Sequence, residues 1–173
     1  MAIAIRKLHH ANVYLNGEHF AGIASEVTLP EVKAMVADHS PTCLNGKVEL
    51  AYGLDKLKLV IKGDFDPAFV MVANDFYHQQ HFTLRSVLTT TEDGEGRTMQ
   101  SSVAVHVRGM FQGYKAEAFK NDGPTEVEYN VSCTYLKVEV DGVPIQEINL
   151  LKNTHKVAGN DLNDIQNALL GIN

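Results

Sequence analysis

The sequence lacks the features that define several classes of protein. It contains no tryptophan and only two cysteines, Cys43 and Cys133. Because Cys133 falls on the apolar side of an alternating segment, a lone buried thiol is favoured over a disulfide, which suits a reducing compartment. No apolar run approaches the ~20 residues of a membrane span, and the N-terminus does not match a signal peptide. Membrane insertion is therefore not expected.

Positive charge is also scarce. The 15 lysines and arginines are outnumbered by 21 acidic residues, which gives a formal net charge of -6. No stripe of basic residues interleaved with aromatic ones is present, so a surface that grips nucleic acid is not expected. Hydrophobic residues, by contrast, make up 45% of the 173 residues. This is enough for the core of one soluble domain, residues 1–173.

The longest regular pattern runs from Glu126 to Val140. Alternate residues from Val127 to Tyr135 are apolar, which is the period of a half-buried strand. After Tyr135 the apolar residues occupy the other set of positions, beginning with Leu136. A shift of one residue reverses the two faces of a strand, so we expect a bulge or a crossing between two sheets near Tyr135. The strand would span roughly 45 Å, longer than average and suited to a wall or tube.

Two residue pairs predict tight hairpin turns, because each places a glycine after a residue that tolerates positive φ. They are Asn16-Gly17 and Asp141-Gly142. Other alternating segments predict strands, although Glu31–Asp38 would also suit a helix. The expected strands are the arms of the hairpin Asn12–Ala21, Glu26–Leu29, Glu31–Asp38, Leu54–Lys62, His81–Thr91 and Thr98–Met110.

Two segments predict helices. Asp66 and Pro67 predict the N-cap and first residue of a strongly buried helix that ends near Tyr77. Asn160-Asp161 predicts the cap of a short helix in the C-terminal segment, residues 151–173. The residues expected to share a face of this second helix are Leu162, Ile165 and Leu169.

Residues 39–53 predict a loop, because Ser40-Pro41, Asn45-Gly46 and Gly53 all favour turns. Residues 1–11 are interpreted as an N-terminal arm. The residues alone therefore indicate a mostly-β single domain with one central helix and one terminal helix.

One group of residues has the spacing of metal ligands. His78 and His81 are three residues apart, and Asp75 lies one turn earlier. They straddle a predicted helix end and strand start, where ligand geometry is not ensured, so solvated loop histidines are the preferred interpretation. The acidic segment Glu92–Gly96 lacks the ligand spacing of a calcium loop. With no phosphate-binding loop or nucleophile elbow, the sequence predicts no catalytic, cofactor-binding or metal-ligating residue.

A series of short motifs, in order, resembles one known family. Together they resemble the major tail tube protein of contractile-tailed bacteriophages, a family that includes the tube of R-type pyocins. The resemblance extends from about Asn12 to Gly171. The motifs are Asn12-Val-Tyr-Leu-Asn-Gly17, Val27-Thr-Leu-Pro30, Leu44-Asn-Gly46, Gly53-Leu-Asp55, Val107-Arg-Gly109, Cys133-Thr-Tyr135, Val140-Asp-Gly142 and Val157-Ala-Gly-Asn-Asp-Leu162.

The resemblance implies a β-sandwich or partly open barrel with a flanking helix, whose strands contribute to an intersubunit barrel. It implies hexameric rings that stack into a hollow tube inside a contractile sheath. DNA, or ions in a headless particle, would pass through this tube without specific binding after sheath contraction. The implied partners are further copies of the chain and the sheath, tape-measure, baseplate and tail-terminator proteins. The location would be the virion tail, assembled in the host bacterial cytoplasm, and no enzymatic activity is implied.

The resemblance also places particular segments in the tube. The lumen wall would comprise Val27–Asp38, Leu54–Gly63, His81–Thr91 and Thr98–Arg108. Basic side chains on or beside these strands that could face the lumen are Lys33, Lys58, Lys62 and Arg85. The segment 39–53 joins two of these strands and would emerge at one rim of a ring. Its residues expected to contact the next ring are Leu44, Asn45, Gly46, Leu50 and Tyr52.

Two alternatives remain open at this point. One is a related tube protein that is secreted by a type VI secretion or extracellular injection system. The other, of a different class, is a ligand-binding or metal-binding β-barrel that uses Asp75, His78 and His81. Microscopy of the purified protein separates the two classes, because rings or tubes are expected only from a tube protein.

Overall fold

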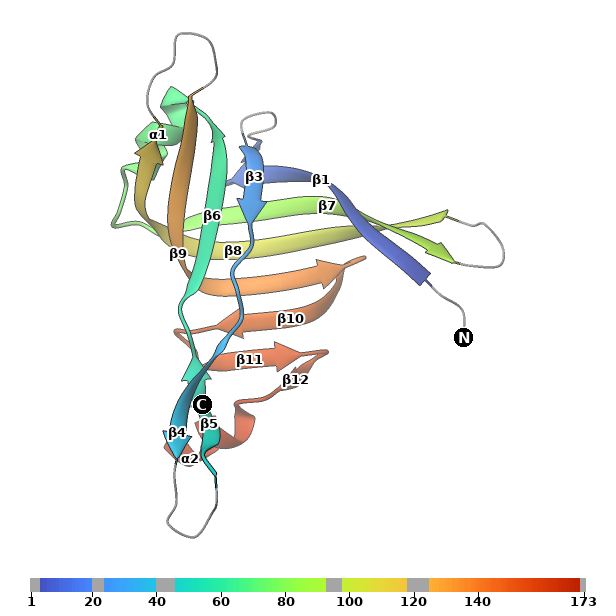
Figure 1. Ribbon diagram of the computed structural model, residues 1–173, viewed down its shortest axis with the longest axis vertical. Coiled ribbons are helices and arrows are strands. Elements are labelled where there is room, and N and C mark those ends of the chain that lie inside the picture. The colour runs from blue at the N-terminus through green and yellow to red at the C-terminus, as the bar shows by residue number, and fades with distance from the viewer. Residues whose placement is uncertain (1–3, 20–23, 40–45, 93–97, 118–124, 172–173) are drawn as a thin grey trace.

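The computed structural model describes residues 4–19, 24–39, 46–92, 98–117 and 125–171 (Figure 1). The helices are α1 (Pro67–Ala73) and α2 (Asp164–Leu170). Within these described ranges, no helix has the length and apolar character needed to cross a membrane. The strands are β1 (Ala4–Leu15), β2 (Glu18–His19), β3 (Ala24–Thr28), β4 (Ala34–His39), β5 (Val48–Leu54), β6 (Leu57–Asp64), β7 (Gln80–Glu92), β8 (Thr98–Ala116), β9 (Glu126–Val140), β10 (Val143–Asn149), β11 (Thr154–Val157) and β12 (Asn160–Asp161).

Two layers of sheet share the long strands β8 and β9. In the first layer, residues 126–133 of β9 pair with β6, which pairs with β3. In the second layer, residues 135–140 of β9 pair with β10, and β11 and β12 follow. β8 pairs with both parts of β9, while β7 and then β1 extend the second layer on the other side. In Figure 1, β3 and β6 cross in front of β7 and β8, which is the predicted β-sandwich.

The strand β9 passes from one layer to the other at a β-bulge, where the sequence pattern predicts one. Arg108 pairs with Tyr135 and Gly109 pairs with Cys133, so Thr134 is the extra residue. The bulge keeps apolar side chains in the core on both sides of the phase change. The buried residues of β9 are Val127, Tyr129, Val131, Cys133 and Leu136.

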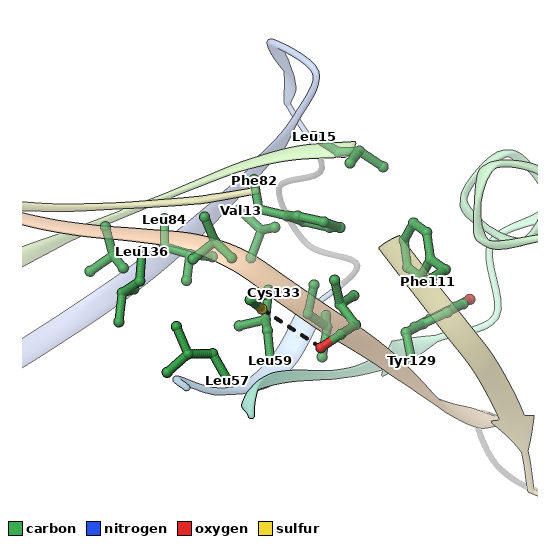
Figure 2. Close-up of a cluster of buried hydrophobic side chains, with 14 of the residues drawn as sticks. Val13, Leu15, Leu57, Leu59, Phe82, Leu84, Phe111, Tyr129, Cys133 and Leu136 are labelled. Carbon is green, nitrogen blue, oxygen red and sulfur yellow. Dashed lines mark hydrogen bonds between the residues drawn. The ribbon is translucent and has the colours of Figure 1, made fainter. Parts of the chain in front are cut away.

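The core lies between the two layers, and Figure 2 shows its side chains. Leu57 and Leu59 of β6 approach from one layer, and Phe82 of β7 approaches from the other. The Phe111 ring packs edge-on against Phe82, with 5.5 Å between the ring centroids. Because this one cluster includes residues of β6 in one layer and of β7 in the other, it joins the two layers.

Cys133 is the free buried thiol that its position in the pattern predicts. Its Sγ donates a weak hydrogen bond to the Val131 carbonyl oxygen at 3.6 Å, the dashed line in Figure 2. Burial raises the pKa of this thiol to about 11. The thiol therefore stays protonated near neutral pH and has little nucleophilic reactivity. Cys43 lies outside the described residues.

The helix α1 begins at the predicted cap but is shorter than predicted. The Asp66 carboxylate accepts a hydrogen bond from the Phe69 N–H at 2.8 Å, and Pro67 is the first helical residue. The helix ends at Ala73, because the Asn74 side chain donates to the carbonyl oxygen of Val70 and ends the run. The residues that follow, as far as Tyr77, are therefore outside the helix, and the predicted end near Tyr77 is wrong.

The largest correction concerns residues 39–53, which the sequence predicts as a loop. Strands β4 and β5 pair as an antiparallel hairpin, from Ala34 opposite Leu54 to His39 opposite Val48. Residues 40–45 lie outside the described ranges. The residues of both strands are exposed, apart from the half-buried Leu54. Val48, Leu50, Tyr52 and Leu54 alternate with Glu49, Ala51 and Gly53, as in a strand, but Asn45-Gly46 and Gly53 favour turns and outweigh this pattern.

Other boundaries also differ from the predictions. β1 begins at Ala4, so most of the predicted N-terminal arm is a strand paired with β7. The two strands predicted on either side of Pro30, which cannot donate to a ladder, form with shifted bounds, and the second begins at Ala34 instead of Glu31. The next predicted strand starts at Leu57 instead of Leu54, because the Asp55 N–H bonds to the Lys33 carbonyl oxygen and turns the chain.

The C-terminal helix also begins later than predicted. Asn163 is the N-cap of α2, whereas Asn160 and Asp161 form the short strand β12. The Asp161 carboxylate accepts hydrogen bonds from the N–H groups of Asn163 and His155, and these donors lower its pKa. Asp161 therefore stabilises the turn before the helix and does not cap the helix itself. The apolar residues assigned to one helix face, Leu162, Ile165 and Leu169, are all largely exposed.

Candidate assembly surfaces

The hairpin of β4 and β5, here called the projecting hairpin, extends from the sandwich at one end of the long axis (Figure 1). Of the residues predicted to contact the next ring, Leu44 and Asn45 lie outside the described residues. Gly46 is exposed, and the side chains of Leu50 and Tyr52 are 54% and 63% exposed. Exposed apolar side chains on a protruding hairpin are typical of a surface that a partner covers.

A cavity of about 590 Å³ lies between the projecting hairpin and the C-terminal segment. Tyr52 and Leu54 line it from β5, and Leu150 and Leu162 line it from the C-terminal side. Sequence reasoning missed this cavity, because it forms where segments about one hundred residues apart in the chain meet. The one available signal was the pair Leu150-Leu151, two apolar residues that directly follow a strand.

An open strand edge forms a third candidate surface. Among the described residues, β2 pairs with β1 only at Tyr14 and Leu15, and no other strand pairs along the remainder of that edge. The side chains of Ile5 and Leu8 on this strand are 69% and 54% exposed. An exposed apolar edge strand is a template for pairing with another chain. This edge therefore fits a strand contributed by a neighbouring molecule.

The two predicted hairpin turns form at their glycine pairs. Asn16 and Gly17 have φ of 52° and 88°, and Asp141 and Gly142 have φ of 50° and 78°. The Asn16 side chain donates to Gln80 Oε1 at 2.6 Å and accepts from a backbone N–H of β7 at 3.0 Å. The first turn is therefore tied to β7 as well as to its own strands.

Asp141 makes the second turn sensitive to pH. The Ser101 hydroxyl and the Ser102 N–H donate to its carboxylate and lower its pKa. Because the pKa of Asp141 is lower in the folded than in the unfolded protein, its charged carboxylate stabilises the fold. This stabilisation is complete above the unfolded-state pKa and is lost as the pH falls through the folded-state pKa. This stability is therefore lost below about pH 4.

Asp141→Asn keeps a turn residue that tolerates positive φ but removes the charge. We expect the variant to be less stable than the wild type at pH 7, and the difference to shrink at pH 3. Urea midpoints of dilute subunits at both pH values measure this effect. An equal difference at both pH values would exclude a role for the Asp141 charge.

The four basic residues proposed for the lumen lie in three different settings. Lys58 and Lys62 are on the outer face of β6, and Lys62 forms an ion pair with Glu26 at 3.0 Å. Arg85 is on the outer face of β7, where its guanidinium lies 5.7 Å from the centre of the Tyr14 ring. Lys33 precedes β4 and is exposed. Because β6 and β7 belong to opposite layers, their outer faces point away from each other.

The structure brings two of the three possible metal ligands together. The Asp75 carboxylate pairs with the His78 ring at 2.8 Å and accepts from the N–H groups of Tyr77 and His78. The hydrogen bond with the His78 side chain is the largest cause of the lowered pKa of Asp75, and the two N–H groups lower this pKa further. His81 lies on the following strand. In the described part of the chain, no three His, Cys, Asp or Glu side chains are grouped as a metal site.

Metal removal therefore tests the alternative of a metal-binding β-barrel. We expect EDTA to leave both the melting temperature and any assembly unchanged, because the Asp75–His78 pair is already complete without a metal. Thermal melts with and without the chelator measure this effect. A large drop in melting temperature with EDTA would contradict the expectation.

The fold is a β-sandwich whose projecting hairpin and open strand edge expose apolar side chains. Solved structures of similar fold come from contractile injection systems. The anti-feeding prophage cap has a TM-score of 0.54 at 8% identity, covering 75% of this chain and 87% of that chain. The sheath-tube complex of an extracellular contractile injection system has a TM-score of 0.53 at 9% identity, with the same two coverages. At such identities these likenesses show the fold alone.

The chain belongs to the phage tail tube protein FII family, whose model matches residues 5–171. It is 28% identical over 159 residues to the tail tube protein of Escherichia phage P2, covering 90% of this chain and 91% of that protein. The family predicted from the sequence motifs is therefore confirmed. The chain is a structural subunit of a phage tail tube and a component of the virion tail.

Proposed function

We propose that the chain forms hexameric rings that stack into a hollow tube inside a contractile sheath. After contraction of the sheath, DNA passes through the lumen, or ions pass in a headless particle. The net charge of -6 favours passage over binding, because DNA is itself strongly negative. In this proposal residues 1–173 form one tail-tube domain, and the work of the subunit is structural without any enzymatic step.

The observation that carries the proposal is the projecting hairpin with its exposed Leu50 and Tyr52. A hairpin without a core of its own is stabilised when a neighbouring ring covers its apolar side chains. The open edge of β1 supplies a second contact, through which a neighbouring subunit extends the sheet. Together the two surfaces account for growth along the tube and closure of a ring.

Only one outer face of the sandwich lines the lumen in this arrangement. Either Lys58 and Lys62 or Arg85 then face the lumen, because the outer faces of β6 and β7 point in opposite directions. The pairing of Lys62 with Glu26 reduces the attraction of its charge for DNA.

The partners follow from the same assembly. Similar folds occur in a sheath-tube complex, a tube-terminating cap and a baseplate. We therefore include the sheath, baseplate, tail-terminator and tape-measure proteins as partners, with assembly in the host bacterial cytoplasm.

Electron microscopy of the purified chain tests this proposal. We expect monomers or single rings at low protein concentration and hollow tubes when the protein is concentrated. Sedimentation that shows only monomer across a wide concentration range, with no tubes in micrographs, would overturn it.

A further inference from the structure

The turn between β1 and β2 contains a chemically reactive pair, Asn16-Gly17. An asparagine amide that precedes glycine is open to attack by the glycine backbone nitrogen, because glycine has no side chain to hinder the approach. The nitrogen bonds to Asn16 Cγ, the bond between Cγ and Nδ2 breaks, and ammonia leaves from a succinimide ring. Water then opens the ring to aspartate or isoaspartate. The reaction releases ammonia, consumes water and involves no oxidation.

Crowding does not prevent this reaction in the folded subunit. Asn16 and Gly17 are both exposed. No atom lies within 4 Å of the point that a Cβ on Gly17 would occupy. Protection of the amide, where it exists, therefore comes from the hydrogen bonds of the Asn16 side chain.

The Asn16 amide is held at both of its polar atoms. Its Nδ2 donates to Gln80 Oε1 at 2.6 Å, and its Oδ1 accepts from the His81 N–H at 3.0 Å. Ring closure requires the flat face of this amide to turn toward the Gly17 nitrogen, and both bonds oppose such a turn. The N–H donor also polarises the amide carbonyl, but polarisation has little effect while that face is turned away.

Gln80 is a well-fixed acceptor for this contact. Among the described residues it is the only buried Asn or Gln, with 7% of its surface exposed. A buried amide that loses its hydrogen-bond partner is unfavourable, so the bond between Gln80 and Asn16 is expected to persist. The backbone of Gln80 is also paired, opposite Gly109 in the ladder of β7 and β8.

We propose that Asn16 is a deamidation site and that Gln80 suppresses its reaction in the folded subunit. In the unfolded chain neither hydrogen bond exists, so Asn16 reacts there at the rate of any accessible Asn-Gly pair. Folding therefore protects the turn. This inference concerns the chemistry of one turn and does not rest on the proposed tube function.

Conversion of Asn16 removes the turn that joins β1 and β2. Isoaspartate routes the backbone through the former side-chain carbon and so lengthens it. A two-residue turn whose φ angles are 52° and 88° has no room for this extra length. Either product also lacks the Nδ2 donor to Gln80. The modified chain should therefore lose the pairing of Tyr14 with His19.

Peptide mapping by mass spectrometry tests the proposal on the wild-type protein. Dilute subunits are held at mildly alkaline pH, folded or unfolded in urea, and the conversion of Asn16 is followed over time. We expect conversion to be at least about tenfold slower in the folded protein, because two hydrogen bonds oppose it. In urea, Asn45-Gly46, the other Asn-Gly pair of the sequence, should convert as fast as Asn16. Equal rates for Asn16 in both states would overturn the proposal.

Two matched variants test the role of Gln80. Gln80→Met removes the acceptor, whereas Gln79→Met makes the same change at the neighbouring residue, whose amide donates to Thr134 Oγ1 at 3.2 Å. With both variants folded by circular dichroism, we expect conversion of Asn16 to be about fivefold faster in Gln80→Met, the effect of one lost hydrogen bond. Gln79→Met should keep the wild-type rate.

A smaller change covers the case in which Gln80→Met does not fold. Gln80→Asn keeps an amide in the core but withdraws the acceptor by one methylene group, so the same acceleration is expected. An unchanged rate in the folded Gln80 variant, or equal acceleration by Gln79→Met, would show that Gln80 does not control the reaction.

Discussion

The Gly109→Val variant is expected not to fold. Gly109 is buried at the bulge where β8 crosses β9, and its chain partner there is Cys133. A Cβ atom at this position would collide with the backbone oxygen of Ser132 and would lie 2.8 Å from Val131 Cγ1. Backbone in a paired strand can shift only slightly without breaking the ladder that connects the two layers, and the two methyl groups that valine adds beyond Cβ need more room than such a shift gives. Circular dichroism and solubility of the purified variant measure the loss.

Smaller changes at glycine make this expectation quantitative. Gly109→Ala adds one methyl group into the same contact and should cost about 3 kcal/mol, which lowers the melting temperature by roughly 6–12 °C. Gly142→Val meets no atom within 4 Å but must adopt φ near 78°, so we expect an intermediate loss. Gly46→Val has open space and no such φ, and serves as the neutral control. A fully stable Gly109→Val protein would contradict the register of β8 against β9.

The sequence predicts those elements whose pattern is set by the subunit's own core. The alternation in β9 and the phase change at Tyr135 reflect the burial of one face in each layer, so the strand and its bulge are both predictable. The cap at Asp66 is predictable for a similar reason, because a single side chain satisfies the helix N-terminus locally.

The candidate assembly surfaces are less predictable, because burial within the subunit does not set the pattern of their residues. The strands of the projecting hairpin are almost entirely exposed, and although Leu50 and Tyr52 fall in an alternating segment, the glycines beside them favour turns. The sequence therefore places predicted stacking residues in this segment while missing the strand β5. The cavity is missed altogether, since it joins distant segments.

The Leu50→Thr/Tyr52→Thr variant is expected to fold but not to form tubes. Threonine retains a high preference for strands, so the hairpin itself should persist. Both side chains are more than half exposed in the subunit, so their replacement costs the core little. If a neighbouring ring buries them, each contributes roughly 1.5 kcal/mol or more to the contact. Loss of about 3 kcal/mol raises the concentration needed for assembly by more than about a hundredfold.

The matched control changes the same strand region without removing apolar surface. Lys47→Thr/Glu49→Thr also introduces two threonines, and it removes one charge of each sign and one exposed ion pair, between Lys47 and Asp38 at 3.8 Å. Such an exposed pair contributes little, so this variant should assemble like the wild type. Far-UV circular dichroism should show the same β signature for both variants, while micrographs show tubes only for the control. Normal tubes from Leu50→Thr/Tyr52→Thr would show that the projecting hairpin does not contribute to the stacking contact. That variant contains no other change that could replace the lost apolar burial.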